Sequence, residues 1–454
     1  MTAWRVAPVY LAAAAFAIAV SLHGGDPDTY WHLASAKWMV DHGQLLRMDV
    51  FSSTVTGQPY SVGEWLGQLA LYAAHLGGGW TGIALLRATL VAIGAFFLTR
   101  AALRVAPAPF AIAITAFALA LSEITWTDRP QLFTLALFPM LFELLLAARA
   151  GRTALLAAVP PLLLVWTNLH GGYALGLALV AIFAGEAILT RRSAVAFAGA
   201  AILGLAATFI DPGSLGLGAA AAHAASPPRF IVEEAPPDVL KPAGFVFAVF
   251  GLAALALAIA RGGTLLDALL LVPLFWLGLS AQRHMPYFAY AATPFIAAGA
   301  GELWSRWRPA SRFALPRPAT LGIGAGLAAV LAFSLATAPY APDESRYPVA
   351  ARDQLKATTG NLLNEYDWGG FLIWRVPERP VFVDGRLFVF LPDVLTDYEE
   401  MVFVRPRWRE ELDRYAIGEV LLHPDRPLVA ALRDQGWTVL AQDANAVLLR
   451  RPAR

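Results

Sequence analysis

The sequence predicts a polytopic α-helical membrane protein with about eleven transmembrane helices, followed by a C-terminal soluble α/β domain. The 454 residues are 58% hydrophobic and only 15% charged, whereas about 25% of a typical soluble domain is charged. Apolar runs of membrane-spanning length recur up to about residue 340, and beyond it the composition becomes that of a soluble domain. These observations together predict the fold class.

The apolar segments follow one another closely along the chain. A hydrocarbon core about 30 Å thick needs roughly 17–25 apolar residues in each crossing helix. Eleven segments approach or meet this length, at residues 6–22, 81–99, 107–122, 131–147, 154–167, 173–190, 194–210, 244–260, 264–280, 286–300 and 319–338. We expect the first to be an uncleaved span rather than a signal peptide, because many apolar segments follow it.

A shorter apolar segment, Glu64–Gly77, carries Glu64, Gln68 and His75. Its length and its polar side chains predict an interfacial or re-entrant helix, with a short span as the alternative.

Arginines in the short loops predict the orientation. Arg100 and Arg104, Arg149, Arg191 and Arg261 fall in alternate loops, and basic residues in short loops stay in the cytoplasm. The N-terminus is then cytoplasmic. The opposite side receives the long first loop (23–80), a second long loop (211–243) and the C-terminal residues. The predicted division is a membrane domain at 1–340 and a non-cytoplasmic α/β domain at 341–454.

Several function classes are excluded by composition and by missing motifs. A net charge of +1 gives no reason to expect nucleic acid as a partner. The absence of cysteine excludes disulfides, thiol catalysis and thiolate metal sites. The sequence has no Walker loop, dinucleotide fingerprint, Gly-x-Ser-x-Gly elbow or His-Glu-x-x-His motif.

The C-terminal residues predict a small set of elements. Pro348–Thr358 has helical spacing, and Arg379–Arg386 is typical of a short buried strand that ends in a turn. Asp425 is expected to cap a helix at 426–435. The segments 437–441 and 446–451 predict a terminal hairpin.

The first loop contains the densest group of chemistry-capable residues, Asp26, Asp28, Tyr30, Trp31 and His32. Two carboxylates at this spacing can bind a divalent cation such as Mg²⁺ or Mn²⁺, or deprotonate a hydroxyl. If residues 29–40 are helical, Asp28 and His32 lie one turn apart on one face. The alternative is that Asp28 is only a helix N-cap and that the two aromatic residues belong to an interfacial belt.

Other polar residues on the same predicted side are candidates for substrate binding. Each has a structural alternative, such as a helix-terminal charge, an internal ion pair or an interfacial anchor. Arg129, for example, can pair with Asp128 or hold a phosphate. The candidates are Glu64, Asp128, Arg129, Asn168, His170, Arg283 and His284.

Asp28-Thr29-Tyr30-Trp31-His32 resembles the Asp-x-aromatic-aromatic-His stretch of oligosaccharyltransferase catalytic subunits, and so the GT-C superfamily of integral-membrane glycosyltransferases. The stretch also occurs in bacterial relatives of protein mannosyltransferases and aminoarabinose transferases. The topology is similar too, with a long first external loop, an external loop after the seventh span and a variable C-terminal part. The Trp-Trp-Asp signature is absent, since Tyr366-Asp367-Trp368-Gly369-Gly370 is a different pattern.

The resemblance implies a glycosyltransferase of a bacterial plasma membrane that acts on the non-cytoplasmic face. It implies a polyprenyl-phosphate-linked sugar donor, a saccharide, lipid or protein acceptor, and Asp28, with or without Asp26, as base or metal ligand. Arg283, His284 or Arg129 would stabilise the departing lipid phosphate. The alternatives are a transporter or flippase of lipid-linked saccharides, an oligosaccharyltransferase-like transfer to protein, and a non-catalytic scaffold. Trp368, Trp374 and Arg386 can contact saccharide, but core packing is the expected role.

Overall fold

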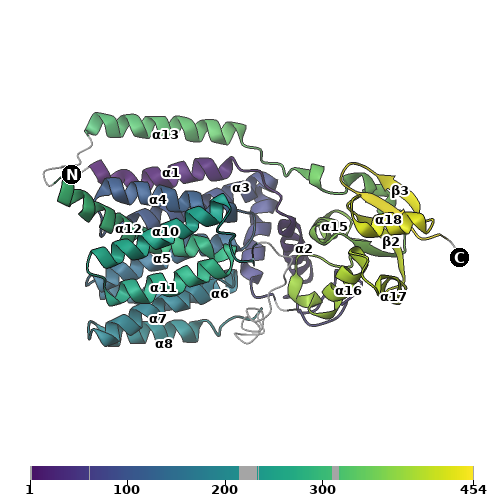
Figure 1. Ribbon diagram of the computed structural model, residues 1–454, viewed down its shortest axis with the longest axis horizontal. Helices are drawn as coiled ribbons and strands as arrows, with labels where there is room; N and C mark the ends of the chain where they lie inside the picture. Colours follow the sequence, from purple (N-terminus) through teal and green to yellow (C-terminus); the bar gives the residue numbers. More distant parts are fainter. Residues whose placement is uncertain (1–2, 61, 214–232, 234, 309–315, 453–454) are drawn as a thin grey trace. The chain divides into compact units, whose positions relative to one another are not determined.

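The computed structural model describes residues 3–60, 62–213, 233, 235–308 and 316–452 (Figure 1). Most of the predicted second external loop, 211–243, lies outside these residues. The chain divides into two compact units. We call Met1–Leu22 with Thr81–Tyr340 the bundle unit, and His23–Trp80 with Ala341–Arg454 the sheet unit.

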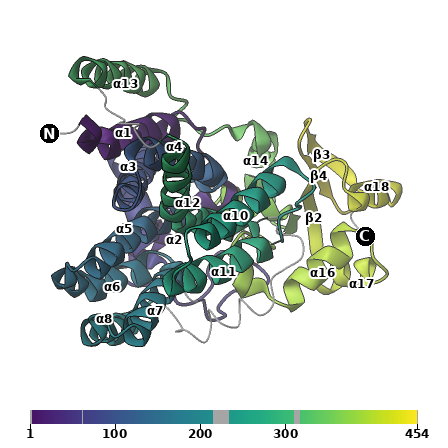
Figure 2. The same ribbon diagram turned by 60° about the vertical axis from the view of Figure 1, so that its left-hand side comes forward.

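The bundle unit is built from the predicted apolar segments, each of which contains a helix. They are α1 (Ala7–Val20), the later part of α3 (Trp65–Leu103), α4 (Ala108–Ser122), α5 (Gln131–Arg149), α6 (Val159–Leu169), α7 (Tyr173–Leu189), α8 (Ala194–Ala207), α10 (Pro242–Ala260), α11 (Leu265–Ser280), α12 (Met285–Trp307) and α13 (Arg317–Thr337). In both Figure 1 and Figure 2, α13 runs beside α1, where Tyr10 donates a hydrogen bond to the Thr320 carbonyl.

Several of these helices have the length and composition of membrane spans. In the described part of the chain, 5 helices qualify by length and composition: Trp65–Leu103, Ala108–Thr125, Gln131–Arg149, Pro242–Ala260 and Pro318–Thr337. Other apolar helices of the bundle unit have 10–17 residues. The chain is therefore a membrane protein with several apolar helices, and the number of crossings stays a prediction.

Four arginines of the predicted cytoplasmic loops form ion pairs with acidic residues of a neighbouring helix. Glu143 accepts from Arg100 at 3.0 Å and from Arg104 at 2.5 Å. Arg149 pairs with Glu186 at 2.8 Å, and Arg261 pairs with Asp267 at 2.6 Å. The Glu and Asp side chains are almost fully buried, so each acid is desolvated together with a cationic partner.

The sheet unit combines the first loop with the C-terminal residues. Its sheet has the order β1-β2-β4-β3, in which β1 and β2 are parallel and the other pairs are antiparallel. Its elements are α2 (Pro27–His42), the first part of α3, α14 (Arg352–Lys356), β1 (Asn361–Asn364), α15 (Gly369–Arg375), α16 (Asp393–Val402), α17 (Trp408–Arg414), β2 (Ile417–Leu422), α18 (Pro427–Asp434), β3 (Thr438–Gln442) and β4 (Val447–Arg450).

A core shared by the first loop and the C-terminal residues explains this grouping. Tyr30 of α2 is fully buried, and its ring meets those of Trp80, Tyr347 and Phe371 edge-on at centroid distances of 5.4, 5.3 and 5.4 Å. Such pairs add to the apolar burial that stabilises a core. The sequence placed residues 23–80 with the membrane helices, whereas here they pack with residues from 341 onward.

Within α3 the backbone leaves helical geometry at Gly78 (φ −156°, ψ 17°) and Gly79 (φ 57°, ψ −142°). The positive φ of Gly79 suits glycine, which has no Cβ to collide with the backbone. The break follows directly after the predicted short helix Glu64–Gly77, whose helical state is confirmed.

In the C-terminal residues the predicted helices near 348–358 and 426–435 and the terminal hairpin are confirmed. The prediction that Asp425 caps the second helix is wrong, because Arg426 is at the N-cap and makes no side-chain capping bond. The predicted strand at 379–386 forms only an isolated bridge between Ser52 and Val381, although Val381, Phe382 and Val383 are fully buried.

Candidate functional site

The predicted site residues fall into both units, and each group is described by itself. In the sheet unit, the first turn of α2 presents the acidic motif. Asp26 is the N-cap, and its Oδ1 accepts a hydrogen bond from the Asp28 backbone N at 2.9 Å. Pro27 follows at the first helical position, where its missing N–H costs nothing. The alternative in which Asp28 is the cap is therefore wrong, because Asp26 has that role.

The Asp28 side chain is held by its own helix. Trp31 Nε1 donates a hydrogen bond of 2.9 Å to Asp28 Oδ1, across one turn of α2. Asp28 itself is half-buried, while Trp31 is 6% exposed and packs in the core of the unit. The carboxylate is thus oriented by a rigid aromatic donor, which suits a general base that must meet its substrate in one geometry.

His32 lies on the side of α2 that meets the first part of α3. Its Nδ1 is 3.3 Å from Gln68 Nε2 and 3.9 Å from Glu64 Oε1. His32 and Gln68 are buried, and Glu64 stands just before the first residue of α3 with 26% of its side chain exposed. His32, Gln68 and Glu64 therefore lie together where α2 meets the first part of α3.

The sheet unit also contains a buried charge cluster that the sequence did not predict. Arg386 pairs with Asp49 at 2.6 Å and with Asp384 at 2.6 Å, and all three side chains have 0% exposure. The guanidinium also lies over the rings of Phe51, at 5.0 Å, and Tyr60, at 5.2 Å. Burial lowers the pKa of Arg386, but the charges of Asp384 and Asp49 raise it by a larger amount. The pKa of Arg386 is therefore above its ordinary value.

Trp368 and Trp374 take positions in this core as well, which agrees with the expected packing role. Trp368 is 2% exposed and donates to the Arg346 carbonyl at 3.2 Å. Trp374 is partly buried, packs against the same core and meets His75 edge-on at 5.5 Å.

In the bundle unit, Asp128 forms an ion pair with a residue that the sequence did not suggest. Arg87 of α3 donates to Asp128 Oδ1 at 2.7 Å, and the side chains are 1% and 2% exposed. Arg87 also donates to the carbonyls of Ala19 and Leu22, at 3.1 and 2.6 Å. It therefore donates to two carbonyls at the end of α1, and this pairing gives Asp128 a structural role.

Arg129 points to a different partner. Its guanidinium pairs with Glu233 at 2.9 Å, a partner that was not considered from the sequence. Asn168 donates to the carbonyls of Leu164 and Ile210, at 2.8 and 2.9 Å. Asn168 is 6% exposed and thereby joins two helix ends, which is a structural function.

His170, between α6 and α7, is held as a neutral hydrogen-bonding group. Its Nδ1 accepts from the Gly172 backbone N at 3.0 Å and lies 2.8 Å from the Thr134 hydroxyl. Because Nδ1 accepts, the neutral ring carries its proton on Nε2. Burial, with the positive charges of Arg283 and Arg129, lowers the pKa of His170 to about 3.

His284 has a similar environment. Burial and the charge of Arg283 lower the pKa of His284 to about 4. The charges of Arg129 and Arg283 thus act on the same small region of the bundle unit as the two neutral imidazoles. Positive charge in this region suits an anionic group.

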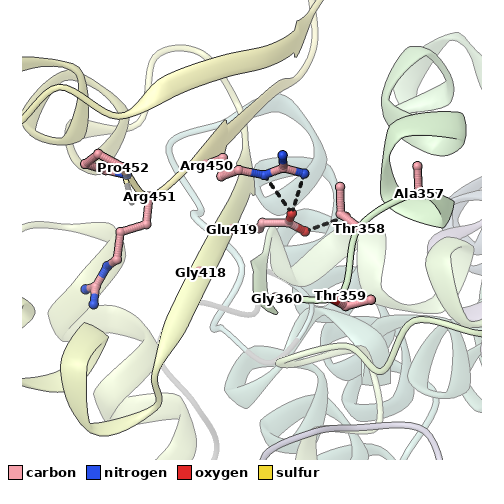
Figure 3. Close-up of a pocket in the computed structure, with 9 residues that line it drawn as sticks. All are labelled: Ala357, Thr358, Thr359, Gly360, Gly418, Glu419, Arg450, Arg451 and Pro452. Atoms are coloured by element: carbon pink, nitrogen blue, oxygen red, sulfur yellow. Dashed lines mark hydrogen bonds and ion pairs between the residues drawn. The ribbon is translucent and has the colours of Figure 1, made fainter. Parts of the chain in front are cut away.

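The sheet unit also contains a separate pocket of about 590 Å³ (Figure 3). Polar side chains of this pocket bond to one another and to neighbouring residues. Its acidic residue, Glu419, is 3% exposed and accepts from Thr358 at 2.7 Å and from Arg379 at 2.8 Å. Arg450, which is about half exposed, approaches the other oxygen at 3.3 Å. The carboxylate therefore already has hydrogen-bond donors within the protein.

A cation between Asp26 and Asp28 would find few protein ligands. Among the described residues there is no group of three or more His, Cys, Asp or Glu side chains placed to hold a metal ion. One Asp26 oxygen caps α2 and one Asp28 oxygen accepts from Trp31.

Comparison with known proteins identifies the fold. No family model and no curated protein matches the sequence. Two solved structures of the oligosaccharyltransferase of Archaeoglobus fulgidus match over 92% of this chain and 69% of theirs, each at 11% identity. The apo form gives a TM-score of 0.55, and the form tethered through a disulfide to an acceptor peptide with the NVT sequon gives 0.58. The fold is GT-C-like.

At this identity the likeness concerns the fold alone. It covers a mostly helical part with several apolar helices and a small C-terminal sheet. The acidic motif begins α2, the helix that follows α1.

Proposed function

We propose that this chain is a GT-C-type glycosyltransferase that moves a sugar from a polyprenyl-phosphate-linked donor to an acceptor hydroxyl. The observation that carries the proposal is Asp28. Asp28 lies in the first turn of α2, the helix that follows α1 in a GT-C-like fold, and Trp31 orients its carboxylate. The fold supports the proposal of lipid-linked glycosyl transfer in general. The particular donor and acceptor are proposed in addition.

The proposed topology has eleven spans in a bacterial plasma membrane, with the N-terminus in the cytoplasm. The alternating arginines support it, and Arg100, Arg104, Arg149 and Arg261 each pair with a buried acid of a neighbouring helix. Residues 23–80, the loop 211–243 and residues 341–454 then lie outside the cytoplasm. The sheet unit is the proposed non-cytoplasmic domain.

The proposed reaction inverts the anomeric centre. Asp28 removes the proton of the acceptor hydroxyl while that oxygen attacks the anomeric carbon, and the bond from this carbon to the phosphate oxygen breaks. The lipid phosphate leaves as an anion. Arg129, Arg283 and His284 are the proposed stabilisers of that charge. His170, kept neutral by its surroundings, can donate a hydrogen bond from Nε2.

The other residues of the first loop have supporting roles in this proposal. Asp26 fixes the helix start, and His32 and Glu64 contribute to the acceptor side of the site. A Mg²⁺ or Mn²⁺ ion held by Asp26 and Asp28 would orient the acceptor, but a lipid phosphate is already a good leaving group. The proposal therefore does not require a metal.

The test is transfer from radiolabelled polyprenyl-phosphate sugars by the purified protein in lipid nanodiscs. The acceptors are saccharide, lipid and sequon-peptide fractions, because the Trp-Trp-Asp signature of protein transfer is absent. We expect transfer to one class, and a loss of about a hundredfold or more with Asp28→Asn. Equal transfer by Asp28→Asn contradicts the catalytic assignment.

A transporter or a scaffold gives a different result. Neither would transfer label with any donor, and a flippase would instead move the labelled lipid between leaflets of a proteoliposome.

A further inference from the structure

Glycines crowd the first turn of α2 within the sheet unit. A methyl group on Gly370, in α15, would lie 2.6 Å from the Pro27 carbonyl oxygen and 3.3 Å from the Trp31 backbone N. A methyl group on Gly385 would overlap Asp28 Oδ1 and lie 2.8 Å from Trp31 Nε1. The C-terminal residues therefore approach the acidic motif at backbone distance, with no room for side chains between them.

Gly385 is needed for space and not for its backbone conformation. Its φ does not fall in the left-handed region, so another residue could adopt the same backbone angles. The atom that an added methyl group would meet first is the carboxylate oxygen of Asp28, which is also the oxygen that accepts from Trp31. Gly385 thus forms one wall of the place that the carboxylate occupies.

The turn that carries Gly385 is held on both sides. Asp384 Oδ1 accepts from the Arg386 backbone N at 2.9 Å, and the Arg386 side chain is buried between Asp384 and Asp49. On the other side, Asn364 accepts from the Phe382 backbone N at 2.7 Å and donates to the Val383 carbonyl at 2.9 Å. Two buried ion pairs and two backbone hydrogen bonds to Asn364 therefore hold this turn in place.

We propose that the turn Asp384-Gly385-Arg386 positions the Asp28 carboxylate for proton removal, an inference that rests on the proposed function. Gly385 sets the space, and the cluster of Asp49, Asp384 and Arg386 keeps the turn against α2. The C-terminal residues thereby act on the reaction through Asp28, and Gly385 is a positioning residue. An overlapping methyl group is relieved most cheaply by rotation of the Asp28 side chain, which breaks its bond to Trp31 and misplaces the base.

The experiment compares Gly385→Ala with wild type in the full-length protein in nanodiscs. Carbodiimide with glycine ethyl ester labels carboxylates, and peptide mass spectrometry reports the rate at Asp28. We expect this rate to rise about threefold or more, the factor for losing one hydrogen bond. We also expect kcat to fall by about tenfold or more, with KM little changed, because the fault is in the geometry of the base. Gly360→Ala is the control, since its methyl group meets nothing nearer than 3.5 Å and should change neither quantity.

Unchanged Asp28 labelling and unchanged kcat in folded Gly385→Ala overturn the proposal. The labelling of Asp28 can change in Gly385→Ala while neither wild type nor variant transfers sugar. That result supports the contact between Gly385 and Asp28 but contradicts the proposed function. If Gly385→Ala does not fold, Asp28→Ala is added to it. Recovery of a monodisperse protein then supports the overlap with Asp28, and continued misfolding overturns it.

Discussion

Arg87 in the bundle unit and Arg386 in the sheet unit are both buried cations, but their surroundings differ. Arg87 divides its donors between one carboxylate, Asp128, and the carbonyls of Ala19 and Leu22. Arg386 meets two carboxylates, Asp49 and Asp384, neither of which is exposed. One arginine closes a helix end, whereas the other ties two distant parts of the chain together.

The difference shows how each unit fixes the residues next to the acidic motif. Arg87 holds the carbonyls at the end of α1, directly before the first loop begins. Arg386 holds the turn that lies against Asp28, and it connects a residue of the first loop with one 335 positions later (384 − 49 = 335). A buried ion pair adds little stability over a well-packed apolar pair, but the loss of one partner costs much.

The largest expected effect is therefore at Arg386. Arg386→Leu leaves two buried carboxylates without their cation, and we expect a loss of about 3–5 kcal/mol in the free energy of unfolding. Thermal unfolding in detergent measures it. Arg405→Leu, which removes a pair with Glu399 at the surface, is the control and should cost less than about 1 kcal/mol. Equal unfolding temperatures for the two variants would contradict the account of the cluster.

Arg87→Leu should have the next largest effect. It leaves Asp128 buried without this cation and leaves the Ala19 and Leu22 carbonyls without this donor, at a cost of about 3 kcal/mol. Limited proteolysis should show earlier cleavage near residues 22–25, because the end of α1 is no longer held. Arg87→Lys keeps the charge but not the three-way geometry, and should be intermediate. A wild-type cleavage pattern in Arg87→Leu would argue against this anchoring role.

A smaller effect concerns pH and the two neutral histidines of the bundle unit. The pKa of His170, about 3, and that of His284, about 4, lie below the ordinary value of 6.5. Between these values the unfolded chain binds more protons than the folded chain, so stability falls as the pH is lowered below 6.5. His170→Gln should weaken this fall, as read from unfolding temperatures between about pH 7.5 and pH 5. An unaltered pH slope would show that His170 is not held neutral.

The smallest expected effect is at the pocket in the sheet unit. Arg450→Ala removes a half-exposed partner of Glu419, which keeps its bonds to Thr358 and Arg379. The free energy of unfolding should fall by less than about 1 kcal/mol. Chemical denaturation of the purified protein measures this loss. A loss as large as that of Arg386→Leu would contradict the predicted difference between the two clusters.

The helices were predictable because hydropathy is a local property. Each apolar segment and the helix that ends at Gly77 were predicted from composition and length alone, whereas a helix at 29–40 was only assumed as a condition. The first and last residues of these helices were harder to predict. Asp425 has the residue type of a cap, but the helix begins later, and the bonding of Asp26 rather than Asp28 at the start of α2 depends on local geometry.

The partners of charged residues were not predictable, because they are set by packing between distant segments. No recognisable motif includes Asp49, Asp384 or Arg386. Arg87 lies inside an apolar segment, where a charged residue was not expected. Arg129 pairs with Glu233, which lies 104 residues away in the sequence. Composition predicted that the first loop is polar and external, but not that its aromatic residues share a core with residues beyond 340.

The most direct test of the central claim compares Asp28→Asn with Asp26→Asn in transfer from a labelled polyprenyl-phosphate sugar. Asparagine caps a helix about as well as aspartate, so Asp26→Asn should fold normally and keep most of the transfer. Asp28→Asn has the same shape but a far weaker base, and transfer should fall by about a hundredfold or more. Equal losses in the two variants, or no loss in Asp28→Asn, would contradict the assignment of Asp28 as the base.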